Sequence, residues 1–306
     1  MIMTSTNEQT LPLLLRYLPS SIRRLLIHVN SHKLEEIRLR LGRPLCIYLS
    51  DTCHYIAPDA SLLPAPQGAY TVTRADMEHA FELICEGSVY ALEQQISQGF
   101  VTVRGGHRIG IVGKAVMQGG HVSYIKEISG LNYRFARQIP GAADRVMPSV
   151  LDNGRIKNTL LIAAPQCGKT TMLRDMARQL SGQGKKVCII DERSEIAGMA
   201  NGISGYELGA QCDVLDACPK AVGMMMALRA MSPQVIITDE IGQEEDMQAI
   251  RSALSCGVSV ITSIHGESRQ SIGTRPNASA LLNLFDCVVT LSKRCGSGTI
   301  EEVYCR

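Results

Sequence analysis

Short, mainly apolar runs recur through the second half of the chain, and each is followed by a segment with helical spacing. Runs of this kind are typical of strands in a parallel sheet that helices cover on both faces. Five strands are predicted, at residues 159–164, 187–191, 235–239, 258–263 and 287–291. Because ligands bind such sheets at the carboxyl ends of the strands, the pattern predicts an α/β domain over residues 141–306 with its chemistry at those ends.

The first half has a different pattern, in which apolar and polar residues alternate as they do in strands with one buried face. Thr73 precedes a helical pattern and is a favoured helix-capping residue. Pro19 is expected to separate two short helices near the start of the chain. Strands are predicted at residues 34–41 and 45–49, and a hairpin at residues 100–117. These elements predict a smaller α+β domain over residues 1–140.

The composition fits a globular protein of two domains. The chain has 306 residues, 45% of them hydrophobic and 20% charged, and domains typically span roughly 100–200 residues. Its 31 Lys and Arg residues nearly balance its 29 Asp and Glu residues, so bulk charge does not favour binding to a polyanion. There is no Trp, and aromatic residues make up only 4% of the chain, so few rings are available to stack on bases. Nucleic acid is therefore not an expected partner.

Targeting signals are not evident in the sequence. No apolar run reaches the length of about 18 residues that a membrane-spanning helix needs. The first ten residues contain no basic stretch followed by an apolar one, so the sequence predicts no signal peptide. We therefore expect a cytoplasmic protein, or one held at the cytoplasmic face of a membrane by a partner.

The most specific motif is A-A-P-Q-C-G-K-T-T at residues 163–171, which fits the phosphate-loop pattern except that Ala163 replaces the first glycine. Consecutive backbone N–H groups at the start of a helix bind phosphate. Gly168 would let the backbone approach the phosphates, Lys169 would reach the β- and γ-phosphates, and Thr170 would ligate Mg²⁺. The residues predicted to bind ATP are Ala164, Pro165, Gln166, Cys167, Gly168, Lys169, Thr170 and Thr171.

Acidic pairs follow two of the predicted strands, Asp239 with Glu240 and Asp191 with Glu192. When a strand is inserted beside the loop strand, the third strand in sequence carries the Walker B acid, and the fourth lies between it and the loop strand. This order assigns Asp239 to the Mg²⁺ shell and Glu240 to the general base that polarises the attacking water. It also brings His265, at the end of the fourth strand, next to the γ-phosphate as a sensor.

Other interpretations of these residues stay open. Glu192 competes with Glu240 as the catalytic base. Asp191 and Glu192 could instead cap a helix or form a local ion pair with Arg193, and His265 could be an ordinary residue at a strand end.

Four motifs together resemble the secretion ATPases of type II and type IV systems: the phosphate loop, the acids after the second strand, D-E-I-G after the third and S-I-H after the fourth. Residues 191–198, 213–226 and 231–242 resemble the stage III sporulation protein AA family more closely, and the resemblance extends over essentially the whole chain. It implies a RecA-like P-loop NTPase that hydrolyses ATP with Mg²⁺.

The resemblance also implies a setting and partners. The family is thought to energise a channel complex between mother cell and forespore, and related ATPases form hexamers. The chain would then act in the mother cell as a homo-oligomer, peripheral at the cytoplasmic membrane face, and contact membrane components of the channel. Candidate arginines for the transition state are Arg104, Arg108, Arg134 and Arg137 in the first domain and Arg229 and Arg269 in the second.

Three other functions compete with a secretion-type ATPase. A nucleic-acid-dependent ATPase of the RecA type would have a similar sheet but would need a basic or aromatic track. A small-molecule kinase would need an arginine-rich lid. A structural subunit gated by nucleotide would bind ATP and barely hydrolyse it.

Overall fold

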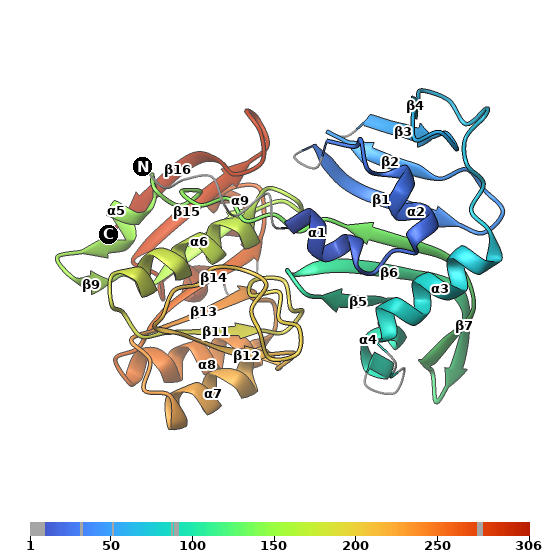
Figure 1. Cartoon of the computed structure of the whole chain (residues 1–306). Coiled ribbons are helices and arrows are strands. Elements are labelled where there is room, and N and C mark those ends of the chain that lie inside the picture. Colours follow the sequence, from blue (N-terminus) through green and yellow to red (C-terminus); the bar gives the residue numbers. More distant parts are fainter. Residues whose placement is uncertain (1–9, 31–32, 51, 87, 89–91, 274–277) are drawn as a thin grey trace. The chain divides into compact units, whose positions relative to one another are not determined.

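The computed structural model describes residues 10–30, 33–50, 52–86, 88, 92–273 and 278–306 (Figure 1). Residues 1–9, for which we predict no signal peptide, lie outside the described residues. Two compact units make up the chain, Met1–Arg137 with Gly198–Gly205, and Gln138–Ala197 with Tyr206–Arg306. The segment Gly198–Gly205, which we predicted within the second domain, thus groups with the first unit.

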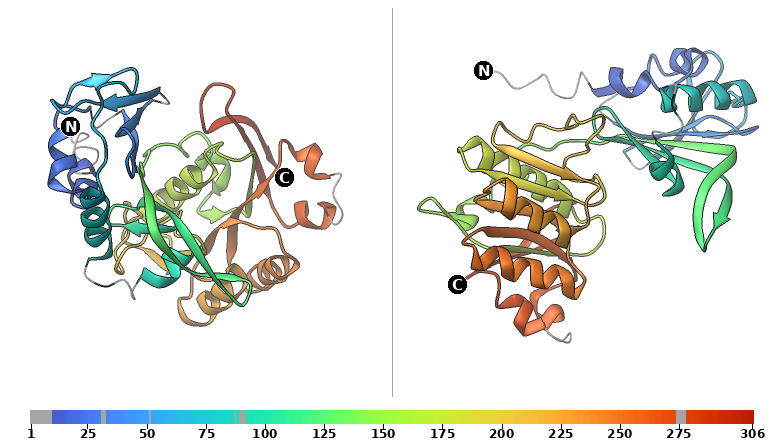
Figure 2. Two further views of the ribbon diagram at one scale, coloured as in Figure 1. Left: turned by 90° about the vertical axis from the view of Figure 1, so that its right-hand side faces the viewer. Right: turned by 90° about the horizontal axis from the view of Figure 1, so that it is seen from below.

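The first unit is built on a seven-stranded antiparallel sheet with the order β4-β3-β2-β1-β7-β6-β5. The strands are β1 (Leu34–Arg40), β2 (Cys46–Leu49), β3 (Thr52–Ile56), β4 (Leu62–Leu63), β5 (Phe100–Val103), β6 (His107–Gln118) and β7 (His121–Arg134). In Figure 2 the β6–β7 ribbon extends beyond the other strands of this sheet. The predicted strands and hairpin are confirmed, whereas β7, which lies between β1 and β6 in the interior of the sheet, was not predicted.

Helices pack on the sheet of the first unit and close its core. They are α1 (Thr10–Leu15), α2 (Ser20–Leu25), α3 (Arg74–Cys85) and α4 (Glu93–Ser97). Fully buried Leu18 and Ile22 pack in one cluster with Ile37 of β1 and with Tyr133 of β7, whose hydroxyl donates a 2.8 Å hydrogen bond to the Tyr17 carbonyl. The predicted cap of α3 is confirmed, since Thr73 Oγ1 accepts a 3.1 Å hydrogen bond from the backbone N–H of Asp76, the third residue of the helix.

The second unit contains a seven-stranded sheet with the order β12-β11-β13-β14-β10-β15-β16. The strands are β10 (Thr159–Ala163), β11 (Val187–Asp191), β12 (Cys212–Asp216), β13 (Val235–Glu240), β14 (Ser259–His265), β15 (Cys287–Ser292) and β16 (Thr299–Cys305). All neighbours are parallel except β15 and β16. The five predicted strands are confirmed, and β14 lies between β13 and the loop strand β10, as the sequence analysis predicts.

Helices cover both faces of this sheet (Figures 1 and 2). Leu160 and Ile162 of β10 pack in one cluster with residues of α7 and α8, while α6 packs on the opposite face. The helices are α5 (Met147–Val150), α6 (Lys169–Gly182), α7 (Lys220–Ala230), α8 (Glu244–Ser255), α9 (Arg269–Gly273) and α10 (Ala278–Leu282), and a small hairpin joins β8 (Leu151–Asp152) to β9 (Arg155–Ile156). None of the helices described is long and apolar enough to cross a bilayer.

Candidate functional site

The phosphate loop joins the buried strand β10 to α6, which begins at Lys169. Its backbone is left-handed at two positions, Gln166 with φ 59° and Gly168 with φ 85°. A Cβ added at Gly168 would lie 3.0 Å from the backbone nitrogen of Gly298 and 3.1 Å from its Cα. Both the backbone conformation and the close approach therefore require glycine at position 168.

The loop between β15 and β16 packs on the phosphate loop. The backbone N–H of Gly298 donates to the Cys167 carbonyl at 3.1 Å, and Ser297 Oγ donates to the Gln166 carbonyl at 3.0 Å. Lys293 Nζ donates to the side-chain oxygen of Gln166, also at 3.0 Å. These contacts hold the left-handed residue Gln166 on both its backbone and its side chain. Sequence reasoning missed them because about 130 residues separate the partners, and no local pattern marks them.

Lys169 is largely buried beneath the loop. Its Nζ donates to the carbonyls of Ala163 at 3.1 Å and Ala164 at 3.3 Å. It also lies 3.5 Å from Oε2 of Glu240, at the end of β13. The loop lysine and the predicted base are therefore already in contact, with the ammonium directed at carbonyls that a bound anion could replace as its partners.

A cavity of about 370 Å³ opens above the loop. Its lining consists of Pro165, Gln166, Gly168, Lys169, Thr170, Thr171, Leu173, Arg193, Glu195, Asp239, Glu240, Ser263 and Ser297. Most of the predicted loop residues and both Asp239 and Glu240 thus meet at one cavity. Among the described residues, Glu192 and His265 do not line it, whereas Arg193, Glu195, Ser263 and Ser297 line it without having been predicted.

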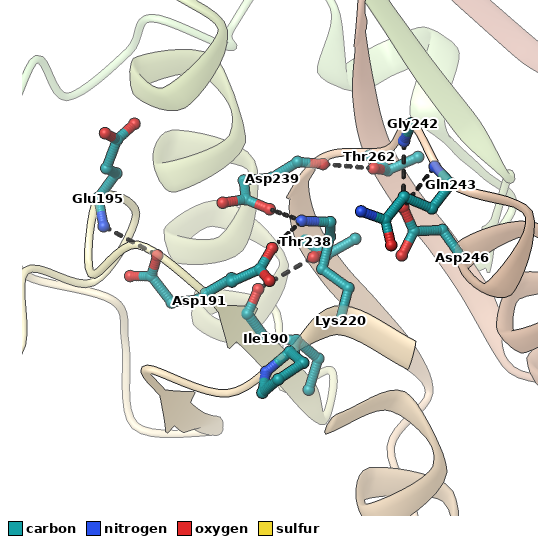
Figure 3. Close-up of polar contacts among 12 residues, drawn as sticks. Ile190, Asp191, Glu195, Lys220, Thr238, Asp239, Gly242, Gln243, Asp246 and Thr262 are labelled. Atoms are coloured by element: carbon teal, nitrogen blue, oxygen red, sulfur yellow. Dashed lines mark hydrogen bonds and ion pairs between the residues drawn. The ribbon is translucent and has the colours of Figure 1, made fainter. Parts of the chain in front are cut away.

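A bulge at the end of β13 directs two consecutive acidic residues into the same cavity. Ile237 pairs with Ile261 of β14, but Glu240 pairs with Ser263, so β13 holds one extra residue between these positions. In a regular strand the side chains of Asp239 and Glu240 would point to opposite faces. Thr262 Oγ1 fixes the bulge by donating a 2.6 Å hydrogen bond to the Asp239 carbonyl (Figure 3).

Asp239 is buried, with 8% of the whole residue exposed. Burial raises its pKa to about 6, although the positive charge of Lys220 acts in the opposite direction. The Lys220 ammonium lies 3.4 Å from Asp239 Oδ1 and also contacts Glu192. Most Asp239 carboxyls are therefore ionised at pH 7, as a metal ligand requires, but Asp239 becomes protonated at a higher pH than an exposed Asp does.

The two acids at the carboxyl end of β11 have different roles in the packing. Asp191 is fully buried, and its two carboxylate oxygens accept 2.8 Å hydrogen bonds from the backbone N–H groups of Glu195 and Ala197. It thus organises the loop that follows β11, but residues 192–211 contain no helix, so Asp191 does not cap one. Burial raises the pKa of Asp191. Glu192 binds Lys220, a residue that the sequence analysis did not single out because its spacing matches no motif.

His265 is the last residue of β14, and its Cα pairs with Ala163 of the loop strand, but its side chain is exposed. Three of the candidate arginines have partners within their own unit. The Arg108 guanidinium lies 4.6 Å from the Phe100 ring, and Arg269 lies 3.6 Å from the Tyr304 ring. Arg137 donates a 2.8 Å hydrogen bond to the Leu34 carbonyl.

The donor set at the cavity fits a magnesium ion that a nucleotide brings with it. Among the residues that the structure describes, no group of three or more His, Cys, Asp and Glu side chains could hold a metal alone. Mg²⁺ usually takes one or two carboxylates and completes its shell with substrate phosphates and water. Asp239 and Thr170, which both line the cavity, provide a carboxylate and a hydroxyl of this kind.

Comparisons with known proteins agree in family and fold. A family model described as "Sporulation stage III, protein AA" matches residues 8–306. Stage III sporulation protein AA of Bacillus subtilis (strain 168) is 40% identical over 298 residues, which are 94% of this chain and 92% of that protein. The ATPase DotB of Legionella pneumophila aligns with a TM-score of 0.57 and 18% identity, covering 89% of this chain and 76% of DotB.

A second solved structure, the pilus retraction motor PilT with bound ADP, aligns with a TM-score of 0.54 and 16% identity, covering 84% of this chain and 74% of PilT. At these identities the structural likenesses establish the fold. The second unit has the RecA-like fold of P-loop NTPases, with a central parallel sheet, and a smaller α+β unit precedes it, as predicted.

Proposed function

The chain belongs to the sporulation stage III protein AA family, and on that premise we propose that it is a Mg²⁺-dependent ATPase, converting ATP and water to ADP and phosphate. The observation that carries the proposal is the cavity at the phosphate loop, where Lys169 lies 3.5 Å from Glu240. A lysine at a helix N-terminus and a carboxylate at the end of a neighbouring strand are what phosphate binding and water activation need.

The phosphates are bound by the backbone N–H groups of residues 164–171 and by Lys169, whose ammonium leaves the carbonyls of Ala163 and Ala164 to do so. Thr170 and Asp239 would hold the Mg²⁺, and the ion would neutralise charge on the phosphate oxygens. Glu240 orients the attacking water and takes its proton. In this role Glu240 is favoured over Glu192 because Glu240 lines the cavity and contacts Lys169, whereas Glu192 is bound to Lys220.

His265 is retained in this proposal as a γ-phosphate sensor at the end of β14. Its backbone position beside Ala163 supports this role, and its side chain would have to turn toward the nucleotide. An arginine from a neighbouring subunit would complete the site.

The proposed setting follows from the family. The chain acts in the mother cell, peripheral at the cytoplasmic membrane face, and energises a channel complex through membrane components of that channel. It works as a homo-oligomer, with a hexamer as the expected ring. Sizing of the purified protein by light scattering, with and without ATP, tests the assembly; a monomer under both conditions contradicts it.

Release of phosphate from ATP tests the catalytic assignment. Glu240→Gln is expected to bind ATP with an affinity close to that of the wild type and to lose hydrolysis by about 10²–10⁴-fold, the usual value of a general base. Glu192→Gln, the matched variant, should retain most of the activity when Mg²⁺ is saturating. If Glu240→Gln turns over at the wild-type rate, the base is wrongly assigned; stimulation by DNA would instead favour a nucleic-acid-dependent ATPase.

A further inference from the structure

Lys220 is the first residue of α7, and it lies between the acidic residues at the carboxyl ends of β11 and β13 (Figure 3). Its ammonium contacts Glu192 Oε2 and lies 3.4 Å from Asp239 Oδ1. Its side chain is 11% exposed, as is that of Asp239. One largely covered ammonium group therefore contacts both Asp239, the proposed Mg²⁺ ligand, and Glu192, the alternative candidate for the catalytic base.

The position of this lysine runs against local helix preference. The N-terminus of a helix carries partial positive charge, so a cation in the first turn of α7 is unfavourable. The first turn of α7 contains no acidic residue to offset it. The compensating charges come from Glu192 and Asp239, on other elements, and such conflicts between local preference and tertiary placement are expected at functional sites.

Two carboxylates, those of Glu192 and Asp239, contact the Lys220 ammonium. Asp191 is already satisfied by the backbone N–H groups of Glu195 and Ala197, which leaves Glu192 and Asp239 as the carboxylates in contact with Lys220. A divalent cation bound to Asp239 would lie within a few ångströms of the ammonium and would be repelled by it. Glu192 offers the lysine a second partner when Asp239 turns to the metal.

We propose that Lys220 is a positioning residue that competes with Mg²⁺ for Asp239, and that Glu192 retains the lysine when the metal binds. Lys220 thereby sets the Mg²⁺ concentration at which the site accepts a nucleotide. The inference rests on the proposed function, in that Asp239 is the Mg²⁺ ligand there.

The test is a Mg²⁺ titration of the full chain with a fluorescent, non-hydrolysable ATP analogue, in which the midpoint of analogue binding is measured. Lys220→Gln should lower the midpoint on the order of tenfold, because it removes a positive charge close to the metal. Lys220→Arg keeps the charge and should stay near the wild type. Lys157→Gln is the matched control, since the Lys157 side chain is only 20% exposed and its ammonium forms an ion pair with Asp152 at 3.6 Å; its midpoint should not change.

Glu192→Gln provides an independent arm with the opposite sign. It leaves Lys220 with Asp239 as its carboxylate partner, so the Mg²⁺ midpoint should rise. In a Lys220→Gln background the same substitution should have little effect, because it acts through the lysine. This arm decides the matter if circular dichroism shows that Lys220→Gln does not fold.

The outcomes of the Mg²⁺ titration distinguish a failure of the proposed role of Lys220 from a failure of the proposed function. If the wild type binds the analogue and Lys220→Gln has an unchanged or higher midpoint, the role of Lys220 is refuted while the proposed function stands. A Glu192→Gln midpoint that is unchanged or lower also refutes it. If the wild type binds no analogue at any Mg²⁺ concentration, the proposed function fails, and the inference fails with it.

Discussion

The close contact between the phosphate loop and the β15–β16 loop makes Gly168→Ala a sharp test of the site. The added Cβ would meet the backbone of Gly298 at 3.0 Å and Ser297 Oγ at 3.2 Å, at a position where φ is +85°. Left-handed backbone costs a non-glycine residue roughly 1–2 kcal/mol. Displacing the β15–β16 loop would also break the hydrogen bond from Gly298 to Cys167, which contributes about 0.5–1.5 kcal/mol.

Gly184→Ala is the matched control, because Gly184 has φ +77° and nothing within 4 Å of the added Cβ. It carries the backbone cost alone, so we expect a loss of about 1–2 kcal/mol of unfolding free energy. Gly168→Ala should lose about 1.5–3.5 kcal/mol in total, because it also loses the hydrogen bond. Urea denaturation followed by circular dichroism measures both, and a fluorescent ATP analogue measures binding.

The binding result separates the two variants most clearly. Gly168→Ala should weaken analogue binding at least tenfold, because its Cβ displaces the turn that approaches the phosphates, while Gly184→Ala should bind like the wild type. Equal losses of stability in the two variants would show that the β15–β16 loop does not press on Gly168. Wild-type binding by Gly168→Ala would show that phosphates bind elsewhere.

Two further predictions concern the buried charges of the second unit. The pKa of Asp239 is about 6 in the folded state, against about 3.9 in the unfolded chain. The folded state therefore favours the protonated carboxyl. The contribution of Asp239 to the free energy of unfolding is greatest below about pH 3.9 and is lost as the pH rises through about 6. When the pH is lowered from 8 to 5, the unfolding free energy of the metal-free wild type, measured with urea, should therefore rise by about 1–2 kcal/mol relative to that of Asp239→Asn. A difference between the two proteins that does not change with pH would contradict the raised pKa. Arg174 is 5% exposed, donates to the carbonyls of Ile196 and Glu195, each at 2.6 Å, and lies 3.6 Å from the Tyr206 ring. Arg174→Met leaves these carbonyls without that donor and should cost about 2–4 kcal/mol; unfolding at the wild-type urea concentration would show that the loop after β11 does not depend on it.

The strands of the second unit could be predicted where they are buried on both faces. β10, β11, β13 and β15 are almost wholly buried, and their sequences are correspondingly apolar. β12 and β16 lie at the edges of the sheet and are partly exposed, so their mixed sequences gave no such signal. Edge strands depend on a neighbour for their structure more than on their own pattern.

The candidate site was predictable only where it follows a motif. The spacing around Lys169 and the acids at the strand ends identified the loop, Asp239 and Glu240. The bulge that directs both acids into one cavity depends on the pairing of β13 with β14, which no local pattern specifies. Lys220 and Gly298 reach the site from distant parts of the chain, so their roles follow from tertiary contacts alone.

The most direct measurement for the central claim is a crystal structure of the protein with Mg²⁺ and a non-hydrolysable ATP analogue. We expect the γ-phosphate to lie against residues 164–171 and the Lys169 ammonium to have left the carbonyls of Ala163 and Ala164 for the phosphates. Asp239 and Glu240 should face the metal and the terminal phosphate. A structure in which the analogue binds away from this loop, or in which both acids point out of the cavity, would contradict the claim.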